Sequence, residues 1–120
     1  MDLKMVIHWE NLPPYFHDVR RFGQLISVLS IHSYYSAWLL QCATGCSESD
    51  ALSVLDHMTS LGLTTHYWEV RRAQSKSPDF VVCRSEPKFP MRVQMGDRWH
   101  TIKEGRAIVS HAYKLKDAEY

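Results

Sequence analysis

Two glycines divide the middle of this 120-residue chain into segments that each resemble a helix with a defined end. Ser47 is followed three positions later by Asp50, which is the pattern of a helix N-cap with a carboxylate that suits the positive helix end. Gly62 ends this segment and Gly45 ends the one before it, because glycine takes a left-handed conformation at low steric cost. Helical spacing of apolar residues predicts one buried stripe between the glycines, made of Ala51, Leu52, Leu55, Met58 and Leu61.

The residues before Gly45 predict two further helices. Asn11 and Pro14 are typical of a helix start, since Asn caps well and Pro fits the first turn. The apolar stripe that follows consists of Phe16, Val19, Phe22, Ile26 and Leu29. Gly23 lies inside this stripe at a cost of about 1 kcal/mol relative to Ala, so a kink or a break stays open there. Residues 34–44 predict a second, shorter helix, whereas the first ten residues predict a short strand or an extended arm.

The second half of the chain has the composition of β-structure. Residues 63–70 are rich in β-branched and aromatic side chains, and residues 80–83 resume that pattern after a turn at 73–79, which predicts a hairpin. Residues 92–95 predict another strand. Residues 107–115 fit either a helix or a strand, and we favour a strand because their apolar residues alternate.

The residues between Leu40 and Leu63 resemble the winged helix-turn-helix superfamily. They include a short helix closed by a Thr-Gly turn, a helix opened by Ser with Leu at the packing positions, and a Leu-Gly-Leu exit before the hairpin. The resemblance covers residues 21–83. It implies an α+β fold with a three-helix core and a β-hairpin wing, to which the strand favoured for residues 107–115 adds an extra C-terminal β segment. The length of 120 residues fits a single domain over residues 1–120, in which we expect residues 84–120 to form an extension that packs on the helix-turn-helix and wing.

The charge distribution argues against DNA binding by the helix that follows Ser47. No lysine or arginine occurs between Arg21 and Arg71, so residues 22–70 sum to −4 and residues 71–120 to +5 within a net charge of +1. In DNA-binding members of the superfamily this helix enters the major groove, yet here it offers no arginine, lysine, asparagine or glutamine to base edges. Closely spaced phosphates would repel an acidic helix that lacks cations.

We therefore expect a non-catalytic adaptor or regulatory module that recognises a protein, or that forms a homodimer through opposite acidic and basic faces. Exposed aromatic residues beside acids are typical of interface hot spots. The expected protein interface consists of Tyr35, Trp38, Glu48, Asp50, Asp56 and His57. The alternative is a small DNA-binding transcriptional regulator that uses its basic wing, with Tyr67 or Trp68 stacking on bases. The expected wing contacts are Arg71, Arg72, Lys76 and Arg84.

Other kinds of site have weaker support in the sequence. Cys42 and Cys46 form one closely spaced pair, whereas structural zinc commonly takes two pairs, so we expect no metal site. Cys83 has no adjacent glycine turn or helix start to lower its pKa, and phosphate-loop and dinucleotide motifs are absent, so we expect no enzyme and no cofactor. Three cysteines suit a reducing compartment. Since apolar runs are short and the N-terminus does not resemble a signal peptide, we expect a cytoplasmic protein without membrane contact.

Overall fold

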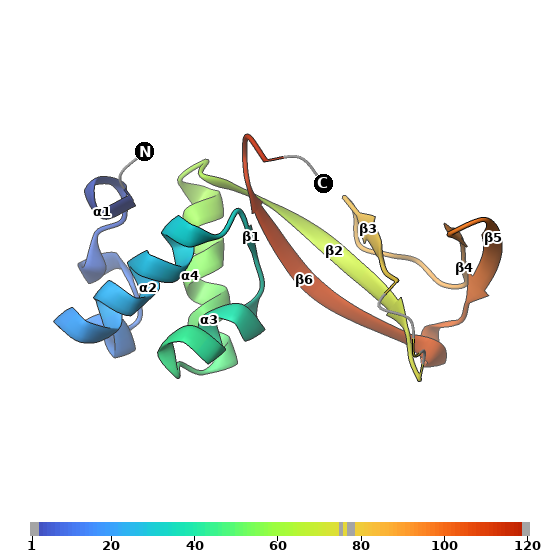
Figure 1. The fold of residues 1–120 in the computed structure, drawn as a ribbon, viewed down its shortest axis with the longest axis horizontal. Helices are drawn as coiled ribbons and strands as arrows, with labels where there is room; N and C mark the ends of the chain where they lie inside the picture. The colour runs from blue at the N-terminus through green and yellow to red at the C-terminus, as the bar shows by residue number, and fades with distance from the viewer. Residues whose placement is uncertain (1–2, 75, 77–78, 119–120) are drawn as a thin grey trace. The chain divides into compact units, whose positions relative to one another are not determined.

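The computed structural model describes residues 3–74, 76 and 79–118. It has the expected α+β architecture, with most of the helical residues in the first half of the chain and antiparallel sheets formed mainly by the second half (Figure 1). The helices are α1 (Leu3–Val6), α2 (Val19–Ile31), α3 (Ala37–Thr44) and α4 (Glu48–Ser60), and short 3-10 helices are η1 (Trp9–Asn11), η2 (Pro14–Phe16) and η3 (Glu104–Arg106). The strands are β1 (Tyr34–Tyr35), β2 (Thr64–Arg72), β3 (Val81–Cys83), β4 (Met91–Met95), β5 (Arg98–Ile102) and β6 (Ala107–Leu115).

Side-chain caps begin helices α2, α3 and α4. In each case a side-chain oxygen accepts a hydrogen bond from a backbone N–H of the first turn, and the pairs are Asp18 with Arg21, Ser36 with Leu39, and Ser47 with Asp50. Gly45 and Gly62 follow α3 and α4 in left-handed conformations, with φ of 75° and 76°. The predicted ends of these two helices are confirmed, and Gly23 lies inside an uninterrupted α2.

The expectations for the N-terminal segment are wrong. Part of the first ten residues forms helix α1 rather than a strand. The helix expected to begin near Asn11 begins at Val19, because Pro14 starts the separate turn η2 and Asp18 provides the cap of α2. Val19 is 80% exposed and therefore does not belong to the buried stripe.

Two expectations in the middle of the chain are also wrong. Residues 34–44 do not begin as a helix, since Tyr34–Tyr35 form strand β1 and Ser36 then caps α3. Leu61 is exposed after the end of α4, whereas Val54, which the predicted stripe omitted, is fully buried.

The chain divides into two compact units. Among the described residues, unit 1 comprises 3–66 and 113–118, and unit 2 comprises 67–112. Both boundaries fall within strands, one in β2 and one in β6. The expectation of a single domain over the whole chain stays a prediction.

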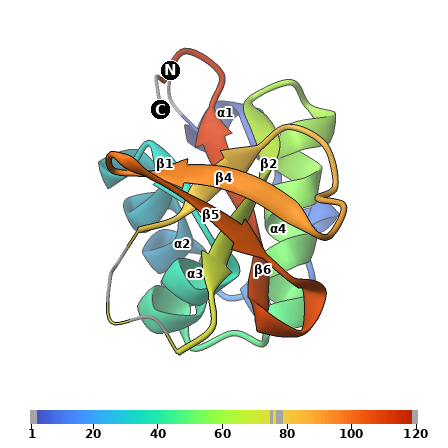
Figure 2. The same cartoon turned by 90° about the vertical axis from the view of Figure 1, so that its right-hand side faces the viewer.

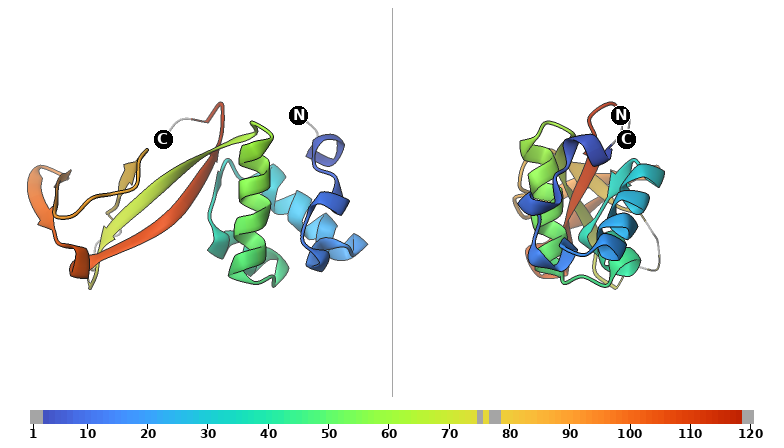
Figure 3. Two further views of the ribbon diagram at one scale, coloured as in Figure 1. Left: turned by 180° about the vertical axis from the view of Figure 1, so that it is seen from behind. Right: turned by 90° about the vertical axis from the view of Figure 1, so that its left-hand side faces the viewer.

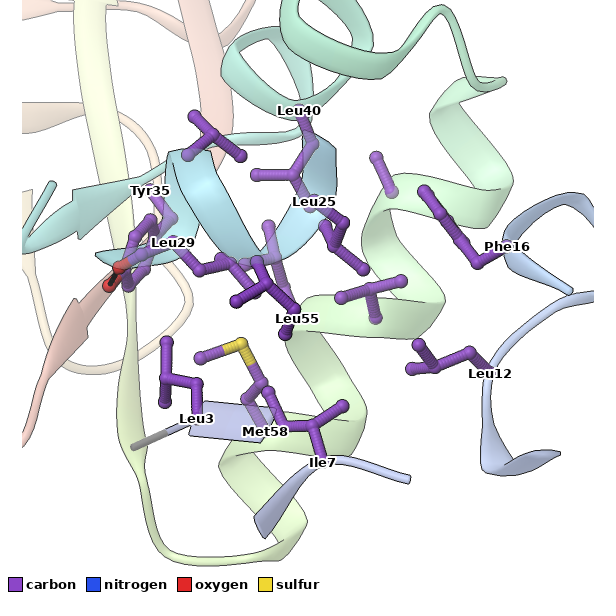
Figure 4. Packing of buried hydrophobic residues seen from close by; sticks show 14 of the residues in the cluster. Leu3, Ile7, Leu12, Phe16, Leu25, Leu29, Tyr35, Leu40, Leu55 and Met58 are labelled. Carbon is purple, nitrogen blue, oxygen red and sulfur yellow. Dashed lines mark hydrogen bonds between the residues drawn. The ribbon is translucent and has the colours of Figure 1, made fainter. Parts of the chain in front are cut away.

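Unit 1 has a core that helices α2, α3 and α4 build together. Leu25 and Leu29 of α2 are fully buried with Leu55 and Met58 of α4, and Leu40 of α3 joins them. The close view shows their side chains pointing toward one another (Figure 4), and two further views show how the three helices cross (Figure 3). Burial of each such side chain stabilises the fold by about 1.5–3 kcal/mol, and their spacing along α2 and α4 is helical.

The larger sheet brings together strands that are far apart in the sequence. Its order is β1-β6-β2-β3. Strand β1 pairs antiparallel with β6, and β2 pairs antiparallel with β3, which confirms the predicted hairpin of residues 63–70 and 80–83. The turn at 73–79 lies partly outside the described residues. Residues 107–115 form a strand, as favoured, but this strand is an inner member of the sheet between β1 and β2 rather than an extra segment added to a wing.

Unit 2 has a second, smaller core. Val70 of β2, Val93 of β4 and Ile102 of β5 are buried against one another. Strands β4 and β5 form a separate two-stranded antiparallel sheet (Figure 2). Strand β4 was predicted from the sequence, whereas β5 was not.

Candidate functional site

Helix α4 carries the acidic side chains that were predicted for a protein interface. Glu48 and Asp50 lie in its first turn, where the positive end of the helix dipole stabilises carboxylates. Glu48 is exposed and Asp50 is half-buried, and Asp56 is exposed further along the helix. Helix α4 contains no lysine or arginine, so its solvent-facing side carries negative charge.

Asp56 also has a structural role within unit 1. The hydroxyl of Tyr113 in β6 donates a hydrogen bond to Oδ1 of Asp56 over 2.6 Å. Burial raises the pKa of Tyr113, and the hydrogen bond to Asp56 and the negative charge of that carboxylate raise it further. The carboxylate therefore holds α4 to β6, and its charge is not purely a surface feature.

The remaining three residues expected at the protein interface differ in their exposure. Trp38 of α3 is 72% exposed, so a large apolar side chain is open to solvent beside the α3–α4 pair. His57 is half-buried, and its Nε2 has no hydrogen-bond partner among the described residues.

Tyr35, in contrast, is 3% exposed and lies in the core of unit 1. Its hydroxyl donates to the carbonyl oxygens of Leu29 and His32 over 2.6 and 2.7 Å. Burial raises its pKa to about 12. The expectation of an interface role for Tyr35 is therefore wrong, because strand β1 turns this side chain inward.

The four cations expected on the wing differ in their exposure to solvent and in their contacts with other side chains. Arg71 is exposed and its Nε lies 3.9 Å from a carboxylate oxygen of Glu69. Arg72 is half-buried, and its NH1 lies 3.3 Å from Nδ1 of His100. Lys76 and Arg84 are exposed.

The two aromatic residues expected to stack on bases, Tyr67 and Trp68, differ in their exposure. Tyr67 is buried, so the expectation that it stacks on bases is wrong. The ring of Trp68 lies 4.6 Å from that of His111, measured between centroids.

The sequence reasoning missed a second exposed aromatic residue, on the β4–β5 hairpin. Trp99 of β5 is 57% exposed. The guanidinium carbon of Arg92 in β4 lies over its ring, 5.0 Å from the centroid. Alternation of polar and apolar residues from Met91 onward, followed by the turn at Gly96, was a usable signal for this hairpin.

Other kinds of site have little structural basis. Cys42 is exposed, Cys46 is buried and Cys83 is half-buried, and burial raises the pKa of the Cys83 thiol. Among residues 3–74, 76 and 79–118, no three His, Cys, Asp or Glu side chains are grouped to hold a metal ion. Within the same residues, no helix combines the length and the apolar character needed to cross a bilayer.

Comparison with protein-family models, with curated proteins and with solved structures finds no match to this chain. The function proposed below therefore depends on the geometry and charge of the residues themselves.

Proposed function

We propose that this chain is a non-catalytic winged-helix module that recognises a protein partner through helices α3 and α4. The succession of α2, β1, α3, α4, β2 and β6, with β6 between β1 and β2, supports the winged-helix arrangement. The observation that carries the functional proposal is the acidic surface of α4, which has no lysine or arginine, together with the exposed Trp38 on helix α3. An exposed indole beside charged groups is a typical anchor of a protein interface.

The charge of α4 favours a basic partner surface. Carboxylates on the helix attract cations and repel phosphates, so they raise the encounter rate with basic proteins and lower it with nucleic acids. Unit 2 is itself basic, with nine lysines and arginines against five aspartates and glutamates. A second copy of the chain is therefore one partner that fits, in which α4 of one protomer meets unit 2 of the other.

The proposal is tested by reversing the charge at Glu48 and Asp50 while Asp56 is kept as the acceptor of the Tyr113 hydroxyl. Solution mass is measured by light scattering over a range of protein and salt concentrations, and partners are captured with immobilised protein. We expect the Glu48→Lys/Asp50→Lys variant to lose self-association or the captured partner.

The matched control is Glu10→Lys, which reverses an exposed acid of η1 elsewhere in unit 1, and it should behave as the wild type. The Trp38→Ala variant should weaken association as well, because an interface anchor commonly contributes 2 kcal/mol or more, on the order of thirtyfold in affinity. A wild type that stays monomeric and captures no partner that the reversal loses would contradict the proposal.

A second candidate function is duplex DNA binding through the basic wing, as in a small transcriptional regulator. The positive excess of unit 2 favours it. The Arg71→Ala/Lys76→Ala variant tests it, because these two cations are exposed, whereas Arg72 contacts His100. Binding to random duplex at low salt that this variant abolishes would support the candidate, and absence of binding at low salt would end it.

A further inference from the structure

The β4–β5 hairpin has two faces of opposite character. Opposite residues of an antiparallel pair share a face, and successive residues alternate between faces. The inner face carries Val93 and Ile102, which belong to the core of unit 2. The outer face, which we call the hairpin face, consists of Arg92, Gln94, Trp99 and Thr101, and all four are exposed.

The inner face holds the outer one in place. Val93 and Ile102 are anchored against Val70 of β2, so the hairpin face lies on a packed strand pair rather than on a loop. Across this pair, Gln94 lies opposite Trp99 and Arg92 lies opposite Thr101. This register makes Arg92 a diagonal neighbour of the indole, within reach of its ring.

The contact between Arg92 and Trp99 places side by side two groups that bind nucleic acids, a guanidinium and an aromatic ring. The guanidinium lies over the ring at 5.0 Å and remains exposed, so it can still pair with a phosphate. The indole keeps 57% of its surface exposed and offers a flat apolar area to a base. Lys103, directly after β5, is exposed and adds positive charge. Arg98 is also exposed, but alternation assigns it to the inner face, and the exposed acids Asp97 and Glu104 lie next to these two cations in the sequence.

We propose that the hairpin face binds single-stranded nucleic acid, with a base stacked on Trp99 and the phosphate backbone held by Arg92 and the neighbouring cations. A single strand is favoured over a duplex because its bases have free faces, whereas the bases of a duplex are stacked on one another and expose only their edges. The side chains of Gln94 and Thr101, on the same face, provide hydrogen-bonding groups beside the stacked base. This inference rests on the same positive excess of unit 2 as the duplex candidate, but it uses different residues.

An acidic peptide would satisfy the cations but would leave the indole without a stacking partner. Stacking on an aromatic side chain contributes on the order of tenfold in affinity per base. The dependence of binding on Trp99 therefore separates a nucleic acid strand from an acidic peptide.

The experiment measures binding of the full chain by fluorescence anisotropy. The probes are labelled oligothymidine and oligouridine of about twelve nucleotides, a length that spans a typical site, a random duplex of the same length, and an oligoglutamate peptide as competitor. We expect the single strands to bind more tightly than the duplex and to resist the competitor. Comparison of the two single strands shows whether the sugar matters.

Two variants test the stacking contact, and a third is the matched control. Trp99→Ala should weaken single-strand binding on the order of tenfold, and Trp99→Phe should restore most of it because a stacking ring is kept. Trp9→Ala removes another exposed indole, on η1, and should leave binding unchanged. Arg92→Ala should weaken binding and make the slope of log K against log salt shallower by about one phosphate contact.

Any of three results would overturn the inference. Trp99→Ala could bind single strands as the wild type does, the duplex could bind as tightly as the single strands, or oligoglutamate of the same charge as the strand could displace it. Circular dichroism of each variant shows whether its fold is kept, and Trp99→Phe decides the matter if Trp99→Ala is unfolded. Loss of single-strand binding only in the Arg71→Ala/Lys76→Ala variant would also overturn it. The Glu48→Lys/Asp50→Lys variant should keep strand binding, so failure of this inference and failure of protein recognition by α4 are distinguished.

Discussion

Some single residues in this chain make contacts that stabilise the fold and that their positions in the sequence do not predict. Asp56 faces solvent from α4, yet its carboxylate accepts the hydroxyl of Tyr113, a residue 57 positions away. Tyr35 satisfies its hydroxyl with two backbone carbonyls and fills the core of unit 1. Both tyrosines therefore act through neutral hydroxyl groups, and their ionisation should weaken the fold.

This gives a prediction for alkaline pH. The pKa values of Tyr35 and Tyr113 are raised by burial above the ordinary value of about 10, to about 12 for Tyr35. The folded state thus holds these protons more tightly than the unfolded state. The stability that they contribute is complete below about pH 10 and is lost as the pH rises toward the folded-state values.

Urea unfolding between pH 7 and pH 12 measures this effect. The free energy of unfolding should fall above about pH 10, and the Tyr35→Phe/Tyr113→Phe variant should lose less over the same range. At pH 8 each substitution should cost about 1 kcal/mol, since the hydrogen bonding of one hydroxyl is removed, shared between two carbonyls at Tyr35 and made to Asp56 at Tyr113. An equally steep fall in the double variant would show that other groups cause it.

At the scale of elements, the ends of the helices follow from local chemistry. Helix α3 ends at Gly45, whose φ of 75° disfavours any residue with a Cβ. A Cβ at this position would also lie 3.1 Å from the hydroxyl oxygen of Tyr15, and that hydroxyl donates to the carbonyl of Thr44. Gly23, in contrast, lies within α2 with nothing within 4 Å of an added Cβ.

These two glycines give opposite predictions for the same substitution. Gly45→Ala should lower the free energy of unfolding by about 1–2 kcal/mol, the cost of a left-handed non-glycine residue. Gly23→Ala should raise it by up to about 1 kcal/mol, because alanine is the better helix former. Gly62→Ala separates backbone strain from the steric contact with Tyr15. Gly62 has a φ of 76°, close to that of Gly45, but nothing lies within 4 Å of an added Cβ. Urea unfolding of the three variants is the measurement, and a stabilised Gly45→Ala variant would contradict this account of how α3 ends.

At the scale of the whole molecule, the two units differ in the size of their cores. Among the described residues, the unit 1 cluster contains sixteen buried side chains, whereas the unit 2 cluster contains Val70, Val93 and Ile102. Regions with few buried apolar contacts open more easily than regions with many. The hairpin that we propose to bind nucleic acid thus belongs to the unit with the smaller core.

Amide hydrogen exchange should therefore be faster in β4 and β5 than in α4. Val93→Ala should accelerate exchange in the hairpin and leave α4 close to the wild type, whereas Leu55→Ala should accelerate exchange in α4, because each removes a buried side chain from one core. Exchange is followed by mass spectrometry on peptides from the two regions. Uniform protection across both units, with equal responses to the two substitutions, would contradict the difference in local stability.

The sequence by itself determined the features that depend on residues within about four positions of one another. The cap at Ser47, the ends at Gly45 and Gly62, the buried positions Ala51, Leu55 and Met58 of α4 and the strands at 63–70 and 80–83 belong to this group, because capping, backbone freedom and side-chain periodicity are local effects. The acidic character of α4 was also evident. Of the six residues expected at the protein interface, the structure leaves Trp38, Glu48 and Asp56 exposed to solvent.

Only the tertiary structure decided which distant segments meet. The place of β6 between β1 and β2, the burial of Tyr35, the partner of Asp56 and the contact of Arg92 with Trp99 depend on pairings between residues far apart in the chain, or on the face that a strand turns inward. Such pairings are selected by the total burial of the fold, and neighbouring residues carry too little of that energy to reveal them.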